Sequence, residues 1–311
     1  MPKSESVGFV GLGVMGSALS GHLLRAGYEV VGYDIAPQRL AEHADREGRP
    51  AASPAEVAAQ VPIVVTSLPS AAALAEVTHG DDGVAAWGAA GLIVLETSTL
   101  PIDVKQDARQ FLGERGISLL DCPLSGTGAQ ARVKDLVVYA SGPRGAYRRC
   151  VPVLEGFARA HYFLGAFGAG SKMKFAANLL VAIHNVSTAE ALVLGMKAGL
   201  DPATMVRVLG DGAGSSRMLQ VRGPMMVRGD YSAAAMKVVV WQKDMAIIGE
   251  FARALDCPTP LFSATTPIYN AAMALGFAEH DTAAVCAVLE ALAKTRRNER
   301  SRRAARTRTR R

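Results

Sequence analysis

Two polar side chains at the start of a long apolar segment have a spacing that could support proton transfer. Lys174 and Asn178 lie four residues apart, and on an α-helix this spacing places both side chains on one face. A lysine can exchange a proton with a substrate oxygen, and a neighbouring amide can orient that oxygen. Lys172 would point elsewhere, toward solvent. From these residues alone, an exposed pair without a chemical role is the better explanation.

Other candidate binding residues follow three predicted strands, where ligands commonly bind in open α/β sheets. These strands are short apolar runs over residues 61–67, 92–97 and 117–121. The residues after them could contact an adenosine, hydrogen-bond a ribose or hold a carboxylate, and they are Leu68 and Pro69, then Ser98 and Thr99, then Ser125, Gly126 and Thr127. Such residues are common in loops, but their shared position at strand ends favours a site. Lys243, beside Asp244 on a predicted helix over residues 234–255, is as ambiguous as Lys174.

The N-terminal segment carries the most specific pattern. An apolar strand is followed by Gly11-Leu12-Gly13-Val14-Met15-Gly16, then by an apolar helix and a second strand that ends at Asp34. The first glycine makes a tight turn, the second lets the backbone approach a pyrophosphate, and the third lets helix and strand pack closely. Phosphates would bind at the helix N-terminus, where N–H groups and the dipole favour negative charge. The pattern predicts a dinucleotide site, and a glycine-rich turn without a ligand is the alternative.

Asp34 bears on the choice of cofactor. A carboxylate here can accept hydrogen bonds from the adenosine ribose, but it would repel the 2′-phosphate of NADP. No arginine follows directly, and Arg39 is the nearest cation. We therefore expect NAD, with NADP less favoured, unless Asp34 only caps the turn before Pro37.

The elements that would position these residues are of two kinds. Over residues 1–168, apolar strands alternate with helices, which predicts an α/β Rossmann domain with a mostly parallel, doubly wound sheet; a strand over residues 136–140 continues the series. Over residues 169–294, long apolar helical periods remain, and Ser171 could cap the first of them. We predict an all-α second domain for substrate and oligomer contacts, followed by a basic, disordered tail over residues 295–311.

Charge and composition narrow the class of protein. The segment from Lys294 to Arg311 has ten Lys or Arg and one acidic residue, so the net charge of +6 leaves about −3 for the rest of the chain. Such a tail could attract nucleic acid, but it lacks interleaved aromatic residues, and a solvated extension explains it better.

Targeting and metal signals are weak. The N-terminus does not resemble a signal peptide, and we find no apolar run approaching the ~20 residues that span a bilayer. The four cysteines lack the spacing of metal or redox sites. We expect a cytoplasmic protein without a metal site and without a membrane or nucleic-acid partner.

Five motifs in this order resemble the β-hydroxyacid dehydrogenase family, which includes 3-hydroxyisobutyrate dehydrogenases. They are the glycine motif, Ser98-Thr99, Asp121-Cys122-Pro123-Leu124-Ser125-Gly126, Gly168-x-Gly170-x-x-x-Lys174-x-x-x-Asn178 and Lys243-Asp244. The resemblance covers about residues 7–293. It implies an NAD(P)-dependent oxidoreductase that transfers hydride between the cofactor and a small hydroxy acid, in a cleft between a Rossmann domain and a helical domain. It also implies a homodimer or homotetramer.

The resemblance also implies roles for single residues. Lys174 would be the general acid/base, Asn178 would position the substrate, and Ser125 and Gly126 with their loop would hold its carboxylate. Thr99 and Lys243 would lie against the nicotinamide half of the cofactor.

Two departures from the family pattern leave the substrate open among 3-hydroxyisobutyrate-, glycerate- and threonate-like acids. Thr127 replaces the second glycine of Ser-Gly-Gly, and Ala177 replaces an amide that often precedes the orienting Asn.

Two other functions compete with this interpretation. An imine reductase on the same scaffold is usually NADP-linked, and Lys174 and Asp34 count against it. A catalytically silent binding protein would keep the fold and use the Arg-rich tail on polyanions, and the intact motifs count against that.

Overall fold

The computed structural model describes residues 6–295. The chain divides into two compact units between Phe175 and Ala176, a few residues beyond the boundary that the sequence predicts. The predicted basic tail lies outside the described residues, except for Thr295.

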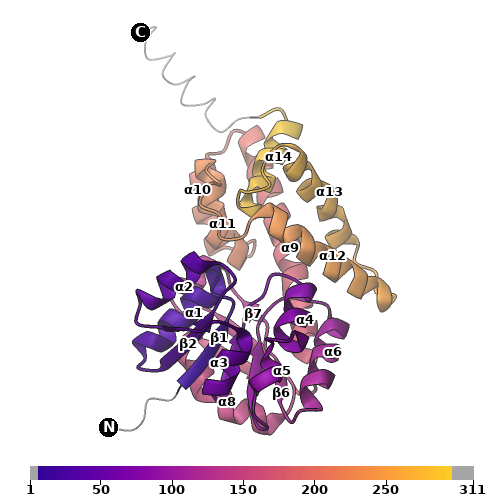
Figure 1. Cartoon of the computed structure of the whole chain (residues 1–311). Coiled ribbons are helices and arrows are strands. Elements are labelled where there is room, and N and C mark those ends of the chain that lie inside the picture. The colour runs from indigo at the N-terminus through magenta and orange to yellow at the C-terminus, as the bar shows by residue number, and fades with distance from the viewer. Residues whose placement is uncertain (1–5, 296–311) are drawn as a thin grey trace, which may run out of the picture. The chain divides into compact units, whose positions relative to one another are not determined.

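A six-stranded parallel sheet forms the centre of the first unit (Figure 1). Strands buried on both faces are near-continuous apolar runs, which is why the sequence shows most of them. In spatial order they are β3 (Arg49–Pro50), β2 (Glu29–Tyr33), β1 (Ser6–Val10), β4 (Ile63–Thr66), β5 (Ile93–Glu96) and β6 (Ser118–Asp121). The strand order reverses between β1 and β4, and ligands of open α/β sheets bind outside the carboxyl ends of the strands at such a point. The predicted Rossmann class is confirmed.

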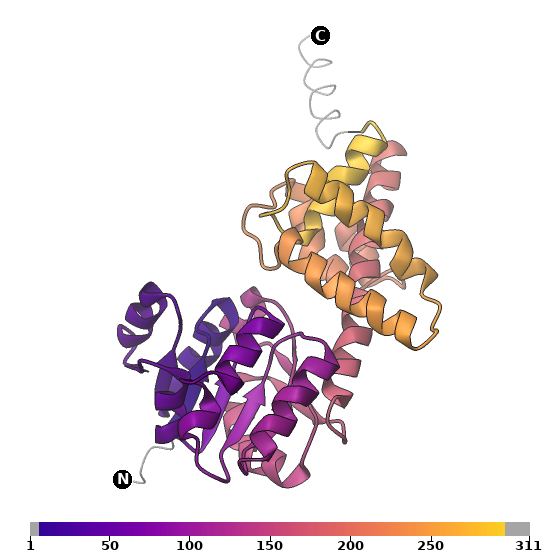
Figure 2. The ribbon, with the colours of Figure 1, turned by 45° about the vertical axis from the view of Figure 1, so that its right-hand side comes forward.

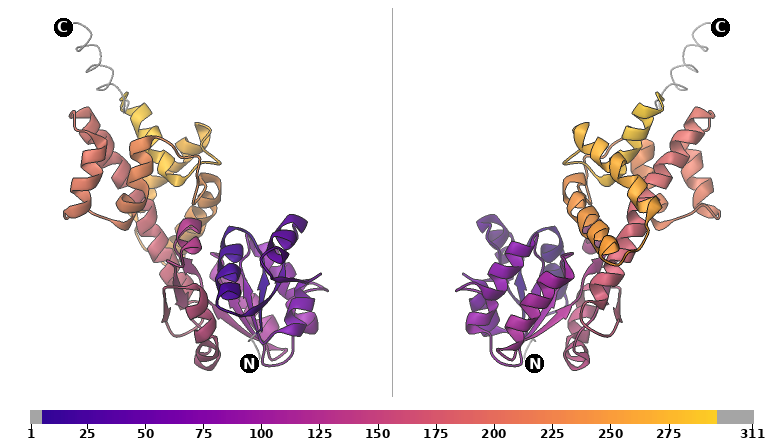
Figure 3. Two further views of the ribbon diagram at one scale, coloured as in Figure 1. Left: turned by 90° about the vertical axis from the view of Figure 1, so that its left-hand side faces the viewer. Right: turned by 90° about the vertical axis from the view of Figure 1, so that its right-hand side faces the viewer.

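Helices cover both faces of this sheet, as Figures 2 and 3 show. Successive strand residues point to opposite faces, so Phe9 and Val65 belong to one apolar cluster while Val10 and Val64 belong to the other. The helices of this unit are α1 (Val14–Arg25), α2 (Pro37–Ala44), α3 (Pro54–Gln60), α4 (Ala71–His79), α5 (Val84–Trp87), α6 (Ile102–Gly113), α7 (Gly128–Arg132) and α8 (Arg144–Phe157).

A separate three-stranded sheet differs from the prediction. It contains β7 (Leu124–Ser125), β8 (Val137–Ala140) and β9 (Ala160–Phe163), with β7 antiparallel and β9 parallel to β8. The sequence predicts a strand at β8 but assigns it to the main series, and it predicts neither β7 nor β9. β7 has two residues and β9 is mostly half-buried, so neither gives an apolar run.

The described part of the second unit contains helices and no strands. They are α9 (Ala169–Lys197), whose first turns belong to the first unit, then α10 (Pro202–Asp211), α11 (Arg217–Arg228), α12 (Val238–Ala254), α13 (Pro260–Ala274), the 3-10 turn η1 (Thr282–Ala284) and α14 (Val285–Leu292). The later helices gather around the part of α9 in this unit (Figure 3).

One expectation about these helices is wrong, and one helix is not predicted. Ser171 does not cap α9, because the helix already begins at Ala169. The sequence does not predict α11, because Gly223 and Pro224 interrupt its helical pattern and proline lacks the N–H that a helix interior uses.

A buried ion pair joins four segments of the second unit. Arg222 on α11 donates from Nε to Asp281 Oδ1 at 3.0 Å and from Nη1 to Asn185 Oδ1 at 3.2 Å. The other oxygen of Asp281 accepts the N–H groups of Ala235 and Met236. One guanidinium and one carboxylate therefore hold together α9, α11, the segment before α12 and the start of η1.

α9 corrects the expectation about membrane-spanning segments. By length and composition alone, this helix is long and apolar enough to cross a membrane. It nevertheless carries buried polar side chains, and Asn185 donates to Tyr269 Oη at 3.1 Å and to Thr282 Oγ1 at 3.4 Å. These bonds are typical of the core helix of a helical domain.

The cysteines form no disulfide. Cys122, Cys150 and Cys286 are buried, and Cys257 is exposed. Burial raises the pKa of Cys150 to about 12 and that of Cys122 well above its ordinary range.

Candidate active site

The glycine motif forms a tight turn between β1 and α1. Gly11 has a φ of +91°, which L side chains rarely adopt, and a Cβ on Gly16 would collide with the Gly11 carbonyl oxygen. Gly13, the N-cap of α1, has no protein atom within 4 Å of where its Cβ would lie. Open space at a helix N-terminus fits a phosphate group. Of the intervening residues Leu12 is buried, Met15 half-buried and Val14 exposed.

Asp34 ends up beside this turn. Its Oδ2 accepts the Leu12 N–H at 2.7 Å, and its Oδ1 accepts the Ala36 N–H at 2.9 Å. The carboxylate therefore fixes the turn and is half-buried. Each carboxylate oxygen has a second lone pair, so these bonds leave capacity for ribose hydroxyls. Arg39, the nearest cation in sequence, pairs with Glu42 at 2.9 Å.

The residues after β4 and β5 meet, as their positions at parallel strand ends predict. The Leu68 N–H donates to Ser98 Oγ at 2.8 Å. Pro69 is exposed, and Thr99 is half-buried. The two loops are thus joined by a direct hydrogen bond through Ser98, the residue before Thr99.

The loop after β6 contains the third predicted group. Ser125 ends β7, and Gly126 has a φ of +134°, so the chain turns there in a conformation that glycine favours. Thr127 is buried at the start of α7, where its hydroxyl donates to Gln130 Oε1 at 3.4 Å and its N–H donates to the same oxygen at 3.0 Å. The threonine that departs from the family pattern therefore has a local structural partner.

Lys174 and Asn178 are buried, unlike the exposed pair that the isolated residues favour. Lys174 is 8% exposed and Asn178 is 4% exposed, whereas Lys172 on the same helix is exposed. Asn178 donates from Nδ2 to Asp244 Oδ2 at 2.9 Å. This bond fixes which way the amide faces, because only its nitrogen can donate.

Lys243 and Asp244 lie next to each other on α12 but differ in surroundings. Asp244 is buried, while the Lys243 side chain is half-buried, with Nζ 3.8 Å from Asp244 Oδ1. The sequence singles out this dipeptide, but it does not indicate that Asp244 binds Asn178.

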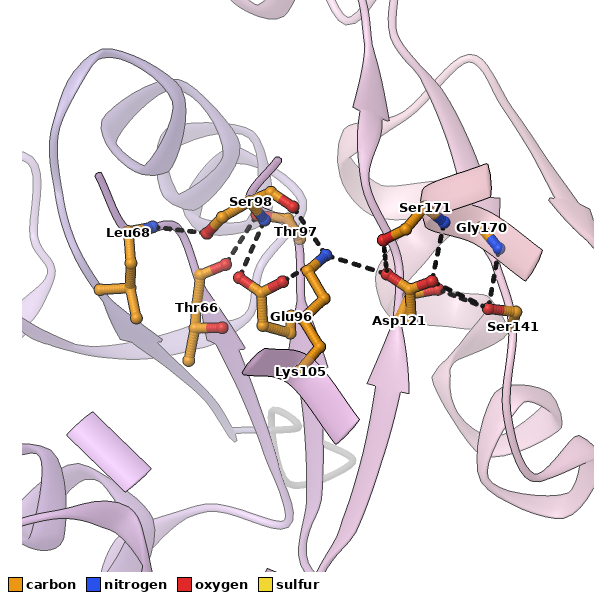
Figure 4. A network of polar contacts seen from close by, with 10 residues as sticks. All are labelled: Thr66, Leu68, Glu96, Thr97, Ser98, Lys105, Asp121, Ser141, Gly170 and Ser171. Atoms are coloured by element: carbon orange, nitrogen blue, oxygen red, sulfur yellow. Dashed lines mark hydrogen bonds and ion pairs between the residues drawn. The ribbon is translucent and has the colours of Figure 1, made fainter. Parts of the chain in front are cut away.

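The structure also contains a buried ionic network that the sequence does not predict. Lys105 on α6 lies with its Nζ 2.6 Å from Glu96 Oε2 and 2.9 Å from Asp121 Oδ1, and all three side chains are fully buried (Figure 4). Burial alone would lower the pKa of Lys105, but the two carboxylates outweigh it and raise that pKa. A signal existed in the sequence, because Lys105 shares the core-facing stripe of α6 with Ala108 and Leu112.

Two family models together match almost all of the described chain. Residues 6–165 match the NAD binding domain of 6-phosphogluconate dehydrogenase, and residues 168–289 match the NAD-binding domain of NADP-dependent 3-hydroxyisobutyrate dehydrogenase.

Single relatives agree with these models. The chain is 35% identical to an L-threonate dehydrogenase of Cupriavidus necator, over 91% of this chain and 95% of that one. Among solved structures, 3-hydroxyisobutyrate dehydrogenase from Salmonella typhimurium has a TM-score of 0.83 at 33% identity and covers 92% of this chain and 100% of its own. An imine reductase of Streptomyces aurantiacus, with a TM-score of 0.62 at 20% identity over 92% of this chain and 99% of its own, shares the fold alone.

Proposed function

Because the chain belongs to the β-hydroxyacid dehydrogenase family, we propose that it oxidises a small hydroxy acid with NAD and uses Lys174 as the general acid/base. As a member of this family it is an NAD(P)-dependent dehydrogenase that acts on a CH–OH group. The observation that carries the proposal is the burial of Lys174, while Lys172 on the same helix is exposed.

The residues present fit a nicotinamide dinucleotide. The space beside Gly13 would admit the pyrophosphate at the N-terminus of α1, and the Asp34 carboxylate would accept the adenosine ribose hydroxyls. Leu68, Pro69 and Thr99 would line the path toward the nicotinamide, with Lys243 near its reactive half. When bound, the nicotinamide accepts or donates the hydride.

Lys174 would take the proton of the substrate hydroxyl as the hydride leaves, and it would return that proton in the reverse reaction. Asn178, whose amide is oriented by Asp244, would hold the reacting oxygen. Ser125, Gly126 and Thr127 would hold the substrate carboxylate through a hydroxyl and loop N–H groups. Threonate-like acids are the first candidates, since an L-threonate dehydrogenase is among the relatives that match most of this chain.

The test compares two lysines of one helix. Lys174→Ala removes the proton acceptor, so we expect kcat to fall by about 10²–10⁴-fold, while NAD affinity measured by calorimetry stays near that of the wild type. Lys172→Ala is the matched control and should keep full turnover. Added methylamine should restore part of the lost rate of Lys174→Ala. Near-normal turnover of Lys174→Ala on every hydroxy acid that the wild type oxidises would refute the assignment.

The preference for NAD rests on Asp34 and on the pairing of Arg39 with Glu42. The ratio of kcat/KM with NAD and NADP measures it, and Asp34→Ser should reduce the preference because the repulsion of a 2′-phosphate is lost. A wild-type enzyme that favours NADP would contradict this part of the proposal. A homodimeric or homotetrameric state and a cytoplasmic location stay predictions.

A further inference from the structure

The buried network around Lys105 ends at two segments of the proposed site. Lys105 lies between Glu96 at the end of β5 and Asp121 at the end of β6 (Figure 4). Every contact described below joins residues of the first unit, to which Lys174 and Thr99 also belong.

At one end of the network, three hydrogen bonds hold Ser98 in place, two of them to Glu96 and Lys105. Its N–H donates to Glu96 Oε1 at 2.9 Å, its carbonyl oxygen accepts from Lys105 Nζ at 2.7 Å, and its Oγ accepts the Leu68 N–H at 2.8 Å. Ser98 immediately precedes Thr99. The backbone that carries Thr99 is thereby tied to the buried charges.

The other end fixes the first turn of α9. Asp121 Oδ2 accepts the Ser171 N–H at 2.8 Å, and Asp121 Oδ1 accepts from Ser171 Oγ at 2.7 Å. Ser141 Oγ accepts the Gly170 N–H at 2.9 Å and donates to Asp121 Oδ2 at 3.2 Å. Both of these N–H groups lie in the first turn, whose N–H groups have no partner within the helix, and Lys174 follows one turn later.

Gly170 permits the close approach of this turn to the strands. A Cβ on Gly170 would collide with the Tyr139 carbonyl oxygen and would lie 2.8 Å from the Asp121 carbonyl oxygen. The network carries two carboxylates and one ammonium group, so it has one excess negative charge. That charge lies at the N-terminus of α9, where the helix dipole favours it.

On this basis we propose that Asp121, held in place by Lys105, is a positioning residue. It fixes the first turn of α9 and thereby the position and orientation of the Lys174 side chain relative to Thr99. The inference rests on the proposed role of Lys174. A side chain that must meet a reacting oxygen is sensitive to small displacements, and a misplacement of ~1 Å can cost on the order of 10²-fold in rate.

Two isosteric variants separate positioning from charge. Asp121→Asn and Glu96→Gln each remove one carboxylate that contacts Lys105, but only Asp121 contacts α9. We expect Asp121→Asn to lower kcat by on the order of 10²-fold with little change in the KM for the hydroxy acid. Glu96→Gln should lower kcat by at most about 10-fold, because Glu96 does not contact α9.

Hydrogen exchange gives a readout that does not depend on turnover. In Asp121→Asn the N–H groups of residues 170–174 should exchange faster than in the wild type, and in Glu96→Gln they should not. If Asp121→Asn does not fold, Ser171→Ala removes one bond to Asp121 and should show the same two changes at smaller size.

Equal losses of kcat in the Asp121 and Glu96 variants would overturn the inference, because the network would then act through charge alone. Unchanged exchange in residues 170–174 of Asp121→Asn, or of Ser171→Ala in its place, would also overturn it. If Lys174→Ala keeps its turnover, the proposed function fails, and the exchange data still show whether Asp121 holds the helix.

Discussion

Each unit of this protein contains a buried cation that pairs with at least one carboxylate, Lys105 in the first unit and Arg222 in the second, and the two cations connect different kinds of segment. Lys105 in the first unit lies between two carboxylates and leaves an excess negative charge, whereas Arg222 in the second unit pairs with the carboxylate of Asp281 and donates to the neutral amide of Asn185. Lys105 connects strand ends that precede predicted cofactor and substrate residues, while Arg222 and Asp281 connect helices and a loop. Lysine is a point charge that can serve two carboxylates, and the planar fork of arginine suits several fixed acceptors.

Removing either cation should have the largest effect on stability. Lys105→Met and Arg222→Met each leave buried carboxylates without a counter-ion, and we expect each to lower the free energy of unfolding of its own unit by about 3–5 kcal/mol. Urea denaturation followed by circular dichroism measures the loss. Only Lys105→Met should also reduce kcat under conditions where both variants are folded. Comparable losses of kcat in both would show that the two networks do not differ in function.

A glycine pair offers a smaller and more local test of the first network. Gly170 and Gly145 are each the second residue of a helix, α9 and α8 respectively. Gly170→Ala should destabilise by about 1–3 kcal/mol, because its Cβ meets backbone oxygens, and it should lower kcat by displacing the turn before Lys174.

Gly145→Ala is the control. It adds a Cβ that meets no atom within 4 Å and should stabilise by about 0.4–1 kcal/mol. Thermal melts of both variants settle the sign, and a neutral Gly170→Ala would contradict the close packing around Asp121.

The last comparison has no effect at neutral pH and appears only as a difference in alkaline stability. Burial raises the pKa of Cys150 in the first unit from 9.0 to about 12, and burial raises that of Tyr269 in the second from 10.0 to about 12. A group whose pKa is higher in the folded state contributes stability that is complete below the unfolded pKa and is lost as pH rises toward the folded pKa. The loss should begin above about pH 9 in the first unit and above about pH 10 in the second. Cys150→Ala should reduce the earlier decline without abolishing it, because burial also raises the pKa of Cys122 in the same unit, and unfolding at a series of pH values measures the change.

The difference between the two networks also explains what the sequence could and could not predict. The glycine turn, the strands and the spacing of Lys174 and Asn178 are local patterns, so they are visible along the chain. The ion pairs of Lys105 and Arg222 cannot be predicted from a local pattern, because their carboxylate partners lie on other elements of the chain. Arg222 lies among the buried Met218, Leu219 and Met226 on α11, but Pro224 hides that helix from a periodicity argument. Asp121 belongs to a motif that the sequence analysis quotes, yet its contact with Ser171 depends on how the strand end meets α9.

The positions of the cysteines allow the unfolding of each unit to be followed by thiol labelling. A thiol must be accessible and ionised to react with a maleimide or a disulfide reagent, and three of the four are enclosed. The folded protein should consume one equivalent of reagent rapidly, at Cys257. Later equivalents would report opening of the first unit through Cys122 and Cys150, and of the second through Cys286. Peptide mapping of the labelled protein would then time the two events separately in a single sample.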